Sequence, residues 1–410
     1  MPGTKTMRFE AAISRERDAV AAAEDCARQI ATRLNDGQPP DLLFVFVSPL
    51  YGPDGVTAFE ILRRDLKVRQ TLGCSGGGIL ASGVEVEDGP ALAVMAARLP
   101  GVTLKPFHLL NENIPNLDFG PREWEDALGV KATEDPHFIV LADPFSMRAE
   151  ELLGGLDFAF PNAVKVGGLA SGARARGQNV LFLGDRVVRE GAVGLALCGN
   201  VRLEALVAQG CTPLGQPLTI TQCKENLLVE VSGRKPLEWV AEIYERAEER
   251  ERMLIRSALF VGMVQDPYKQ GTPSAGDFLI RNIMGRDPAT DGLYLGANLR
   301  QGQVVQFHVR DGVAANADLA AVLRRYSTEL LKEGQGDAVP RQPCGALLFS
   351  CLGRGKHMYG KSGHDSELFR EFLGDVPLSG FFCNGEIGPV GGTTYLHGFT
   401  SCFGVLRPRK

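Results

Sequence analysis

The chain has 410 residues, of which 44% are apolar and 23% are charged. This length exceeds what one hydrophobic core supports, so we expect two domains of roughly 150 to 200 residues each. The apolar content argues against intrinsic disorder. The net charge of −5 and the lack of a Lys/Arg stripe argue against nucleic acid and anionic membranes as partners.

Nine cysteines are spread widely along the chain. Their odd number and wide spacing do not suggest a disulfide framework, and residues 1–10 show no hydrophobic region of a signal peptide. No apolar run reaches the roughly 18 residues that a membrane span requires. We therefore expect a soluble cytoplasmic protein with reduced thiols.

Glycine is unusually frequent, with 49 residues, and it clusters at the ends of apolar runs. Before the first cluster, apolar residues in 11–34 recur at helical spacing and predict an amphipathic helix. A first unit follows, with a strand at Leu42–Val47, a helix at Val56–Leu66, a glycine loop at Gly73–Gly78 and a strand at Ala91–Leu99. The unbroken apolar run of its first strand indicates burial on both faces.

The same order of strand, glycine loop and strand recurs twice. The second copy comprises Phe138–Ala142, Gly167–Gly172 and Ala192–Cys198, and the third comprises Leu347–Leu352, a helix at Ser366–Leu373, Gly380–Gly388 and Phe399–Leu406. Strand start and loop glycine are about 30 residues apart in each copy, which indicates a weak internal repeat. We predict a two-domain layered α/β protein, with stacked mixed sheets flanked by helices and pseudo-repeated strand–helix–glycine loop–strand units.

The stretch between the second and third copies has a different pattern of predicted elements. Pro236 stands at a first helical position, and Leu237–Arg256 predicts one long helix. Strands are predicted at Phe278–Ile283 and Gln303–Arg310, and a helix at Asp318–Leu331. We expect an N-terminal helix in 1–34, a first domain over 35–230 and a second over 231–407.

Eight short stretches carry a resemblance to a known family. They are Gly73–Gly76, Gly167–Gly172, Gly191–Leu197 and Gly210–Gly215, followed by Phe278–Arg281, Gly302–His308, Ser350–Gly355 and Gly380–Gly388. Together they resemble the FIST proteins, named for F-box and intracellular signal transduction, in which a FIST N-terminal domain precedes a FIST C-terminal domain. The resemblance covers about residues 35 to 407.

This resemblance implies a sensory signal transduction module that binds a small molecule, with amino acids as the proposed class. We predict that the module is non-enzymatic. It also implies a signalling protein as partner. The residues before the first domain number about 34, which is too few for an F-box, so a ubiquitin-ligase adaptor role is not expected. No cofactor is expected.

A candidate ligand pocket is predicted where the loops of the third copy meet. Arg354 offers a bidentate donor for a ligand carboxylate, while Glu386 and Asn384 suit an amino group. In the alternative, Arg354 and Glu386 pair with each other and only hold two loops together. The other candidates are Gly353, Gly355 and Gly385, whose amides permit close approach, and more weakly Ser75, Ser171, Arg281 and His308.

Other chemistries compete with this pocket. Gly355–Ser362 has the spacing of a phosphate-binding P-loop, but Gly363 falls where the following helix should start. Cys351 and Cys383 are candidate reactive thiols, which would make the protein a cysteine-dependent enzyme, if the neighbouring arginine lowers a thiol pKa. A zinc site is not expected, because the His and Cys spacings match no common ligand set. A third alternative is a protein-interaction scaffold.

Overall fold

The computed structural model describes residues 6–35, 37–265, 273, 275–333 and 342–409. Their contacts define two units. The first unit holds residues 1–207, 321–389 and 393–410, and the second holds 208–320 and 390–392. The sequence boundary expected near residue 231 falls inside the second unit.

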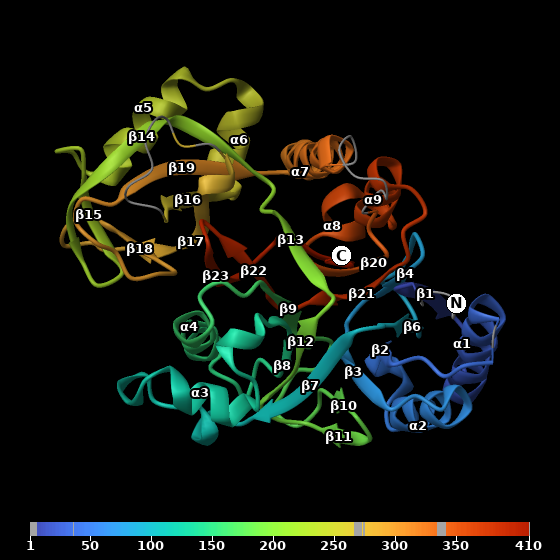
Figure 1. Ribbon diagram of the computed structural model, residues 1–410. Helices are drawn as coiled ribbons and strands as arrows, with labels where there is room; N and C mark the ends of the chain where they lie inside the picture. The colour runs from blue at the N-terminus through green and yellow to red at the C-terminus, as the bar shows by residue number, and fades with distance from the viewer. Residues whose placement is uncertain (1–5, 36, 266–272, 274, 334–341, 410) are drawn as a thin grey trace. The chain divides into compact units, whose positions relative to one another are not determined.

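Within the described residues, the first unit contains three six-stranded sheets that share one strand order (Figure 1). The first is β1(Arg8–Ser14), β6(Leu92–Arg98), β2(Leu42–Val47), β3(Gln70–Ser75), β10(Leu181–Leu183) and β11(Arg186–Val188). The second is β7(Val102–Leu109), β12(Ala192–Gly199), β8(His137–Ala142), β9(Lys165–Leu169), β22(Glu386–Val390) and β23(Thr393–His397). The third is β13(Arg202–Ala208), β24(Ser401–Arg407), β20(Gly345–Cys351), β21(Leu378–Cys383), β4(Ile79–Ala81) and β5(Val84–Val86).

The two central strands of each sheet are parallel, namely β2 with β3, β8 with β9 and β20 with β21. The outer hairpin of each sheet comes from another repeat. Hairpin β4–β5 of the first repeat pairs with β21 of the third, β10–β11 of the second with β3 of the first, and β22–β23 of the third with β9 of the second. Figure 1 shows blue β4 beside red β21 accordingly. The three repeats therefore exchange hairpins in a closed cycle.

The core of the first unit lies between the sheets and under the helices. Phe46 of β2 stacks on Phe381 of β21 with ring centroids 5.2 Å apart, and Phe349 of β20 meets the Phe381 ring edge-on at 5.9 Å. The opposite faces are covered by α1(Ala19–Leu34) and α2(Asp54–Leu66), or by α3(Pro121–Leu128) and α4(Ala149–Ala159). The predicted mixed α/β fold with repeated units is confirmed.

One predicted helix is wrong over its first third. Residues 8–14 form β1, because they pair along their length with β6 of the same sheet. The helix begins only after Asp18, whose side chain accepts a hydrogen bond from the Ala21 amide at 2.8 Å. Helical spacing continued by chance through a strand whose own burial alternates only in part.

The second unit contains a closed barrel, which the sequence did not predict. Its strand order is β14(Cys211–Lys224), β15(Leu227–Val231), β18(Leu293–Leu295), β17(Phe278–Arg286), β16(Leu259–Val264) and β19(Val304–Arg310). The helix predicted over 237–256 is two helices, α5(Pro236–Arg246) and α6(Glu249–Ser257), because a capping box of Glu248 and Glu251 starts a new helix.

In chain order, the second unit follows β13 and runs into α7(Gly312–Glu333). In the other two repeats, a single helix connects the equivalent strands, α1 between β1 and β2 and α3 between β7 and β8. The barrel is therefore an insertion into the third repeat, which continues with α8(Gly355–Tyr359) and α9(His364–Leu373).

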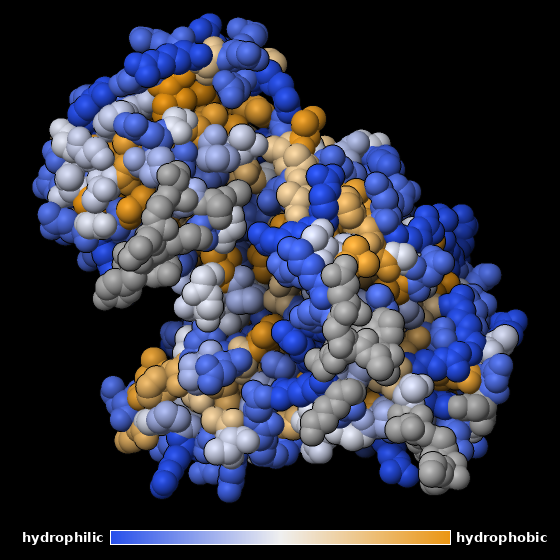
Figure 2. Space-filling view, turned by 45° about the horizontal axis from the view of Figure 1, so that its top comes forward, coloured by the Kyte–Doolittle hydropathy of each residue, from blue (hydrophilic) through white to orange (hydrophobic). Residues whose placement is uncertain are grey.

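The surface view in Figure 2 shows a mostly hydrophilic face interrupted by small hydrophobic groups. Exposed large hydrophobic residues include Leu50, Leu117, Phe119 and Leu352. Among the described residues, no helix combines the length and the apolar character that crossing a membrane requires.

Candidate ligand site at the junction of three glycine loops

Each repeat places a glycine at the same point of its second central strand. These glycines are Gly73, Gly167 and Gly380. A Cβ atom there would lie 1.9, 1.8 and 1.8 Å from the carbonyl oxygens of Val45, Val140 and Leu348, respectively. Because no side chain tolerates such a distance, the two parallel strands can approach only at glycine.

The loops that follow these glycines bind one another through the backbone. The Ser171 amide of the second loop donates to the Ser75 carbonyl of the first, at 3.1 Å. The Asn384 amide of the third loop donates to the Leu169 carbonyl of the second, also at 3.1 Å. In both bonds the donor lies four residues after the glycine of its own repeat, and the acceptor lies two residues after the glycine of its own repeat. The two bonds are therefore equivalent by the repeat symmetry.

The third side of this ring is different. The Gly77 amide donates to the Ser171 hydroxyl at 2.8 Å, and that hydroxyl donates to the Phe382 carbonyl. Ser171 therefore bridges the first and third loops. The Phe382 amide also donates to the Gly78 carbonyl at 2.9 Å. We call the three bonded loops, Gly73–Gly78, Gly167–Gly172 and Gly380–Gly385, the glycine-loop junction.

A cavity of about 420 Å³ lies on this third side of the glycine-loop junction. It is lined by Gly77, Gly78, Glu87, Asp88, Leu352, Lys356, His357 and Phe382. The third repeat has room for it because twelve residues, 352–363, separate β20 from α9, whereas six separate β2 from α2 and six separate β8 from α4. The additional residues form α8, which supplies Lys356 and His357.

Charged groups of both signs line the cavity. The Lys356 amide donates to both carboxylate oxygens of Glu87, at 3.0 and 2.8 Å, and the Lys356 ammonium lies 2.6 Å from Asp88. Burial raises the pKa of Glu87 despite these donors. Gly355 is required here, because its φ is +56° and a Cβ would lie 2.5 Å from a Glu87 oxygen.

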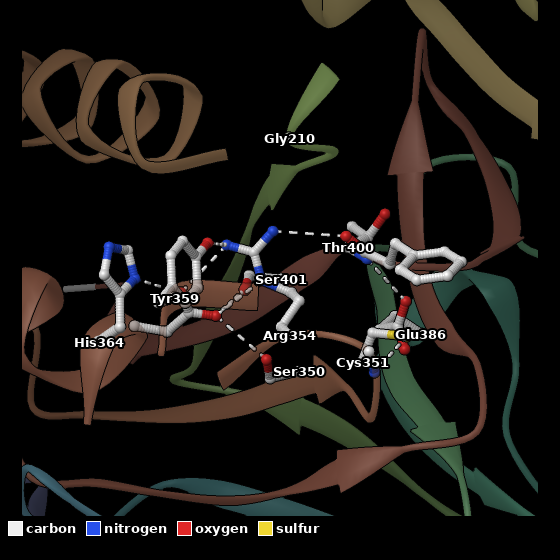
Figure 3. Close-up of polar contacts among 12 residues, drawn as sticks. Gly210, Ser350, Cys351, Arg354, Tyr359, His364, Glu386, Thr400 and Ser401 are labelled. Atoms are coloured by element: carbon white, nitrogen blue, oxygen red, sulfur yellow. Dashed lines mark hydrogen bonds and ion pairs between the residues drawn. The ribbon is translucent and has the colours of Figure 1, made fainter. Parts of the chain in front are cut away.

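Arg354 does not line this cavity but lies fully buried beneath α8. Its Nε and Nη2 donate to the two Asp365 oxygens at 2.9 and 3.0 Å, and Nη2 also donates to the Tyr359 hydroxyl at 2.6 Å. Figure 3 shows its guanidinium lying between the Tyr359 ring and Thr400. Arg354, expected to bind a ligand carboxylate, thus holds an internal one.

Asp365 is the centre of a buried polar network. It accepts from the hydroxyls of Ser350, at 3.1 Å, and Ser401, and lies 2.9 Å from His364 Nδ1. Burial opposes the charged carboxylate, but the Arg354 guanidinium and these hydrogen bonds hold the pKa of Asp365 well below its usual range. The network fixes the start of α9 against β20 and β24.

Glu85 is a second buried carboxylate beside this network. Its oxygens accept from the Gly363 amide at 3.0 Å and from the Ser366 amide and hydroxyl at 2.9 and 2.8 Å. Burial first, and then the charge of Asp365, raises the pKa of Glu85 to about 7. Because Glu85 lies on β5, the hairpin of the first repeat caps α9 of the third.

The remaining candidate ligand-binding residues of the third repeat lie where neighbouring loops contact one another. A Cβ on Gly353 would lie 2.5 Å from the Phe399 ring. Glu386 is fully buried and accepts from the Thr400 amide at 3.1 Å, and Figure 3 shows it beside Cys351. Asn384 is exposed, and the Gly385 carbonyl accepts from the Leu169 amide at 2.8 Å.

The weaker candidates divide between the two units. Ser75 and Ser171 are both buried in the first unit, where Ser75 donates to Asn179 at 3.2 Å. Arg281 and His308 belong to the second unit, on β17 and β19. Burial lowers the pKa of His308 to about 4, so its ring is neutral near pH 7.

The structure also shows the positions of the residues considered for a reactive thiol, a P-loop and a metal site. Burial raises the pKa of Cys383 well above its ordinary value, which disfavours the thiolate, while Cys351 is half-buried. Only the first five residues of the P-loop-like stretch, Gly355–Tyr359, form α8. The Lys356 amide is bound to Glu87, and the Lys361 ammonium lies 2.9 Å from Glu367. Across 6–35, 37–265, 273, 275–333 and 342–409, no group of three His, Cys, Asp or Glu side chains is arranged to hold a metal.

Sequence reasoning missed Asp365, Glu85 and Glu87. Asp365 carried a usable signal, since an acidic residue near the start of a predicted helix marks a helix N-terminus. Glu85 carried another, since a carboxylate between Val84 and Val86 is unusual in a short apolar strand. Their partners lie up to 281 residues away along the chain, which no local pattern predicts.

Comparison with known proteins decides the family. A model of the FIST N domain matches residues 41–234, and a model of the FIST C domain matches residues 236–389. The chain belongs to the FIST family. FIST domains are sensor domains of signal transduction.

Similar chains occur in mycobacteria. The uncharacterized protein Rv0628c of Mycobacterium tuberculosis (strain H37Rv) is 35% identical over 404 residues, covering 98% of this chain and 100% of its own. The uncharacterized protein Mb0898c of Mycobacterium bovis is 34% identical over 405 residues, covering 98% and 99%.

More distant similarities are partial or weak. Human F-box only protein 22 is 43% identical over 51 residues, or 12% of this chain and 13% of its own. The crystal structure of cyanuric acid hydrolase from A. caulinodans matches with a TM-score of 0.33 at 10% identity, over 98% of this chain and 100% of its own. A score this low supports no argument about function or fold.

Proposed function

We propose that this FIST protein is a small-molecule sensor whose ligand binds in the cavity at the glycine-loop junction. The observation that carries the proposal is the position of the cavity, which lies where the first and third repeats meet. Its volume of about 420 Å³ is in the range of small-ligand sites. A ligand there contacts both repeats at once, so its binding changes the stability of the contact between them. A signalling partner recognises that change.

The lining favours a zwitterionic ligand such as an amino acid. The ion pair of Lys356 with Asp88 is exposed and therefore weak, so a ligand can replace it. Lys356 then supplies a cation for the ligand carboxylate, and Glu87 and Asp88 supply acceptors for its ammonium group. Leu352 and Phe382 offer apolar contact for a side chain. Arg354 acts indirectly in this proposal, by holding α8 in place through Asp365.

A metabolite-library thermal-shift screen tests the proposal on the full chain. We expect amino acids to raise the melting temperature, because a ligand that binds only the folded state stabilises it. Leu352→Trp, which fills the cavity, should remove the shift. Leu50→Trp is the matched control, since Leu50 is an exposed leucine that follows the equivalent strand β2. A shift that survives Leu352→Trp would place the ligand elsewhere, and the absence of any shift would contradict the sensor function.

A further inference from the structure

The cavity at the glycine-loop junction is lined by more carboxylates than ammonium groups. Glu87 and Asp88 supply the carboxylates, Lys356 supplies the ammonium group, and His357 adds an imidazole ring. The guanidinium of Arg354 contributes no charge to the lining, because it is buried and already bound to an internal carboxylate. Carboxylates therefore outnumber ammonium groups by one.

This acidic pair is not a requirement of the hairpin that carries it. Glu87 and Asp88 are the two residues that follow β5, the second strand of hairpin β4–β5. The residues at the same place are Arg189 and Glu190 after β11, and Gly398 and Phe399 after β23. All three hairpins form, so two acidic residues are not needed there for the hairpin to fold.

The two carboxylates are held in different ways. Glu87 accepts from the Lys356 amide with both oxygens, at 3.0 and 2.8 Å, so a backbone group fixes its position. Asp88 lies 2.6 Å from the Lys356 ammonium, in a pair whose side chains are 75% and 57% exposed, respectively. Such an exposed pair contributes little free energy. A ligand can therefore separate Asp88 from Lys356 while Glu87 stays in place.

Separating this pair changes the balance of charge at the site. In the sensor proposed above, the ligand carboxylate takes the Lys356 ammonium, and the ligand ammonium group takes one of the two carboxylates. The other carboxylate is then left beside the ligand carboxylate without a cation, and the two like charges repel each other. A second cationic group on the ligand would remove this repulsion.

We propose that the ligand is a basic amino acid, such as lysine. Its α-carboxylate binds Lys356, its α-ammonium group binds Glu87, and its side-chain cation binds Asp88. Leu352 and Phe382 suit the alkyl stem of a basic side chain, since such stems lie along apolar surface while the charged end stays in water. The inference rests on the sensor function proposed above and narrows its ligand class.

Isothermal titration calorimetry on the full chain at pH 8 tests this ligand class. L-Norleucine has the alkyl stem of L-lysine without the terminal ammonium group, and L-glutamate ends in a carboxylate instead. We expect L-lysine to bind about two- to fivefold more tightly than L-norleucine, which is the range of an exposed ion pair, and L-glutamate to bind most weakly. 1,5-Diaminopentane, which is lysine without its carboxylate, should also bind more weakly than L-lysine, because it has no group for Lys356.

Asp88→Asn locates the side-chain cation. We expect the ratio of lysine affinity to norleucine affinity to fall to about one, because the lysine side chain has lost its ion-pair partner. Norleucine binding should not weaken, and it shows that the variant is folded. Glu190→Gln is the matched control, since Glu190 stands at the same place after β11 and does not line the cavity. Its affinity ratio should equal that of the wild-type protein.

The outcomes separate this inference from the sensor function. Equal affinities for L-lysine and L-norleucine in the wild-type protein, or an unchanged ratio in Asp88→Asn, would overturn the basic ligand class and leave the sensor function in place. Tighter binding of L-glutamate or of 1,5-diaminopentane than of L-lysine would also overturn the class. If none of the three amino acids binds, the sensor function is contradicted and the inference with it.

Discussion

The Ser171 hydroxyl donates to the Phe382 carbonyl while accepting from the Gly77 amide, so one side chain joins the first and third glycine loops. Ser171→Ala leaves the half-buried Gly77 amide without its acceptor and removes the donor to the buried Phe382 carbonyl. We expect the free energy of unfolding to fall by about 1–3 kcal/mol, which is the cost of an unsatisfied buried polar group. Urea denaturation measures the change. Thr32→Ala, which removes an exposed hydroxyl on α1, should stay within about 0.5 kcal/mol, and equal effects would show that the bridge is unimportant.

Two glycines of the second repeat make a matched pair. Gly167→Ala places a methyl group 1.8 Å from the Val140 carbonyl oxygen, so we expect a protein that is insoluble or at least ~4 kcal/mol less stable. Gly154→Ala meets no atom within 4 Å and lies inside α4. It should stabilise the protein by about 0.5–1 kcal/mol, because alanine has the higher helix propensity. Soluble yield and denaturant midpoints compare the two. Equal behaviour would contradict the close approach of β8 and β9.

Glu85 should make stability depend on pH. The folded state binds its proton more tightly than the unfolded chain does, because the pKa of Glu85 rises from 4.5 to about 7 on burial. The contribution of Glu85 is therefore most favourable below pH 4.5 and is lost as pH rises toward 7. We expect the melting temperature of the Glu85→Gln variant to fall less between pH 5 and pH 8 than the melting temperature of the wild-type protein. If the melting temperatures of the two proteins change by the same amount between pH 5 and pH 8, Glu85 does not titrate in this range.

The buried pair of Arg354 and Asp365 should be strongly coupled. Arg354→Met leaves a buried carboxylate without its cation, and we expect a loss of about 3–5 kcal/mol in the free energy of unfolding. Asp365→Asn should cost less in the Arg354→Met background than it does alone, so the double variant loses less stability than the sum of the two single losses. Arg176→Met breaks the exposed pair with Glu190 and should cost less than about 1 kcal/mol. Strict additivity of the first two substitutions would contradict the pairing.

Several elements could be predicted from the sequence because their cause is local. Leu42–Val47 is a strand with the predicted limits, since an unbroken apolar run of six residues suits burial on both faces. The three glycine-rich stretches were located because glycine marks a close backbone approach, and the structure shows that approach at Gly73, Gly167 and Gly380. Their prediction as loops was wrong in part, because these three glycines lie inside β3, β9 and β21 and only the residues after each strand form a loop.

The remaining features depend on contacts between distant residues. The exchange of hairpins brings Glu85 to the start of α9, and the closure of the barrel pairs β14 with β19 about 90 residues later along the chain. Arg354 was singled out for its charge and its neighbouring glycines, but its partner was not, because Asp365 lies beyond α8, 11 residues further along the chain. Local patterns thus indicated where the polar residues lie but not which of them pair.

The cyclic exchange of hairpins has a consequence for how the chain can be divided. A single repeat expressed alone would lack the hairpin that completes its own sheet, and it would carry a hairpin with no sheet to join. Both defects leave unpaired strand edges, which promote aggregation. The three repeats must therefore fold as one cooperative body, although their symmetry suggests modules. The connection between β13 and α7 contributes no strand to this exchange, and it is there that the chain accommodates the barrel.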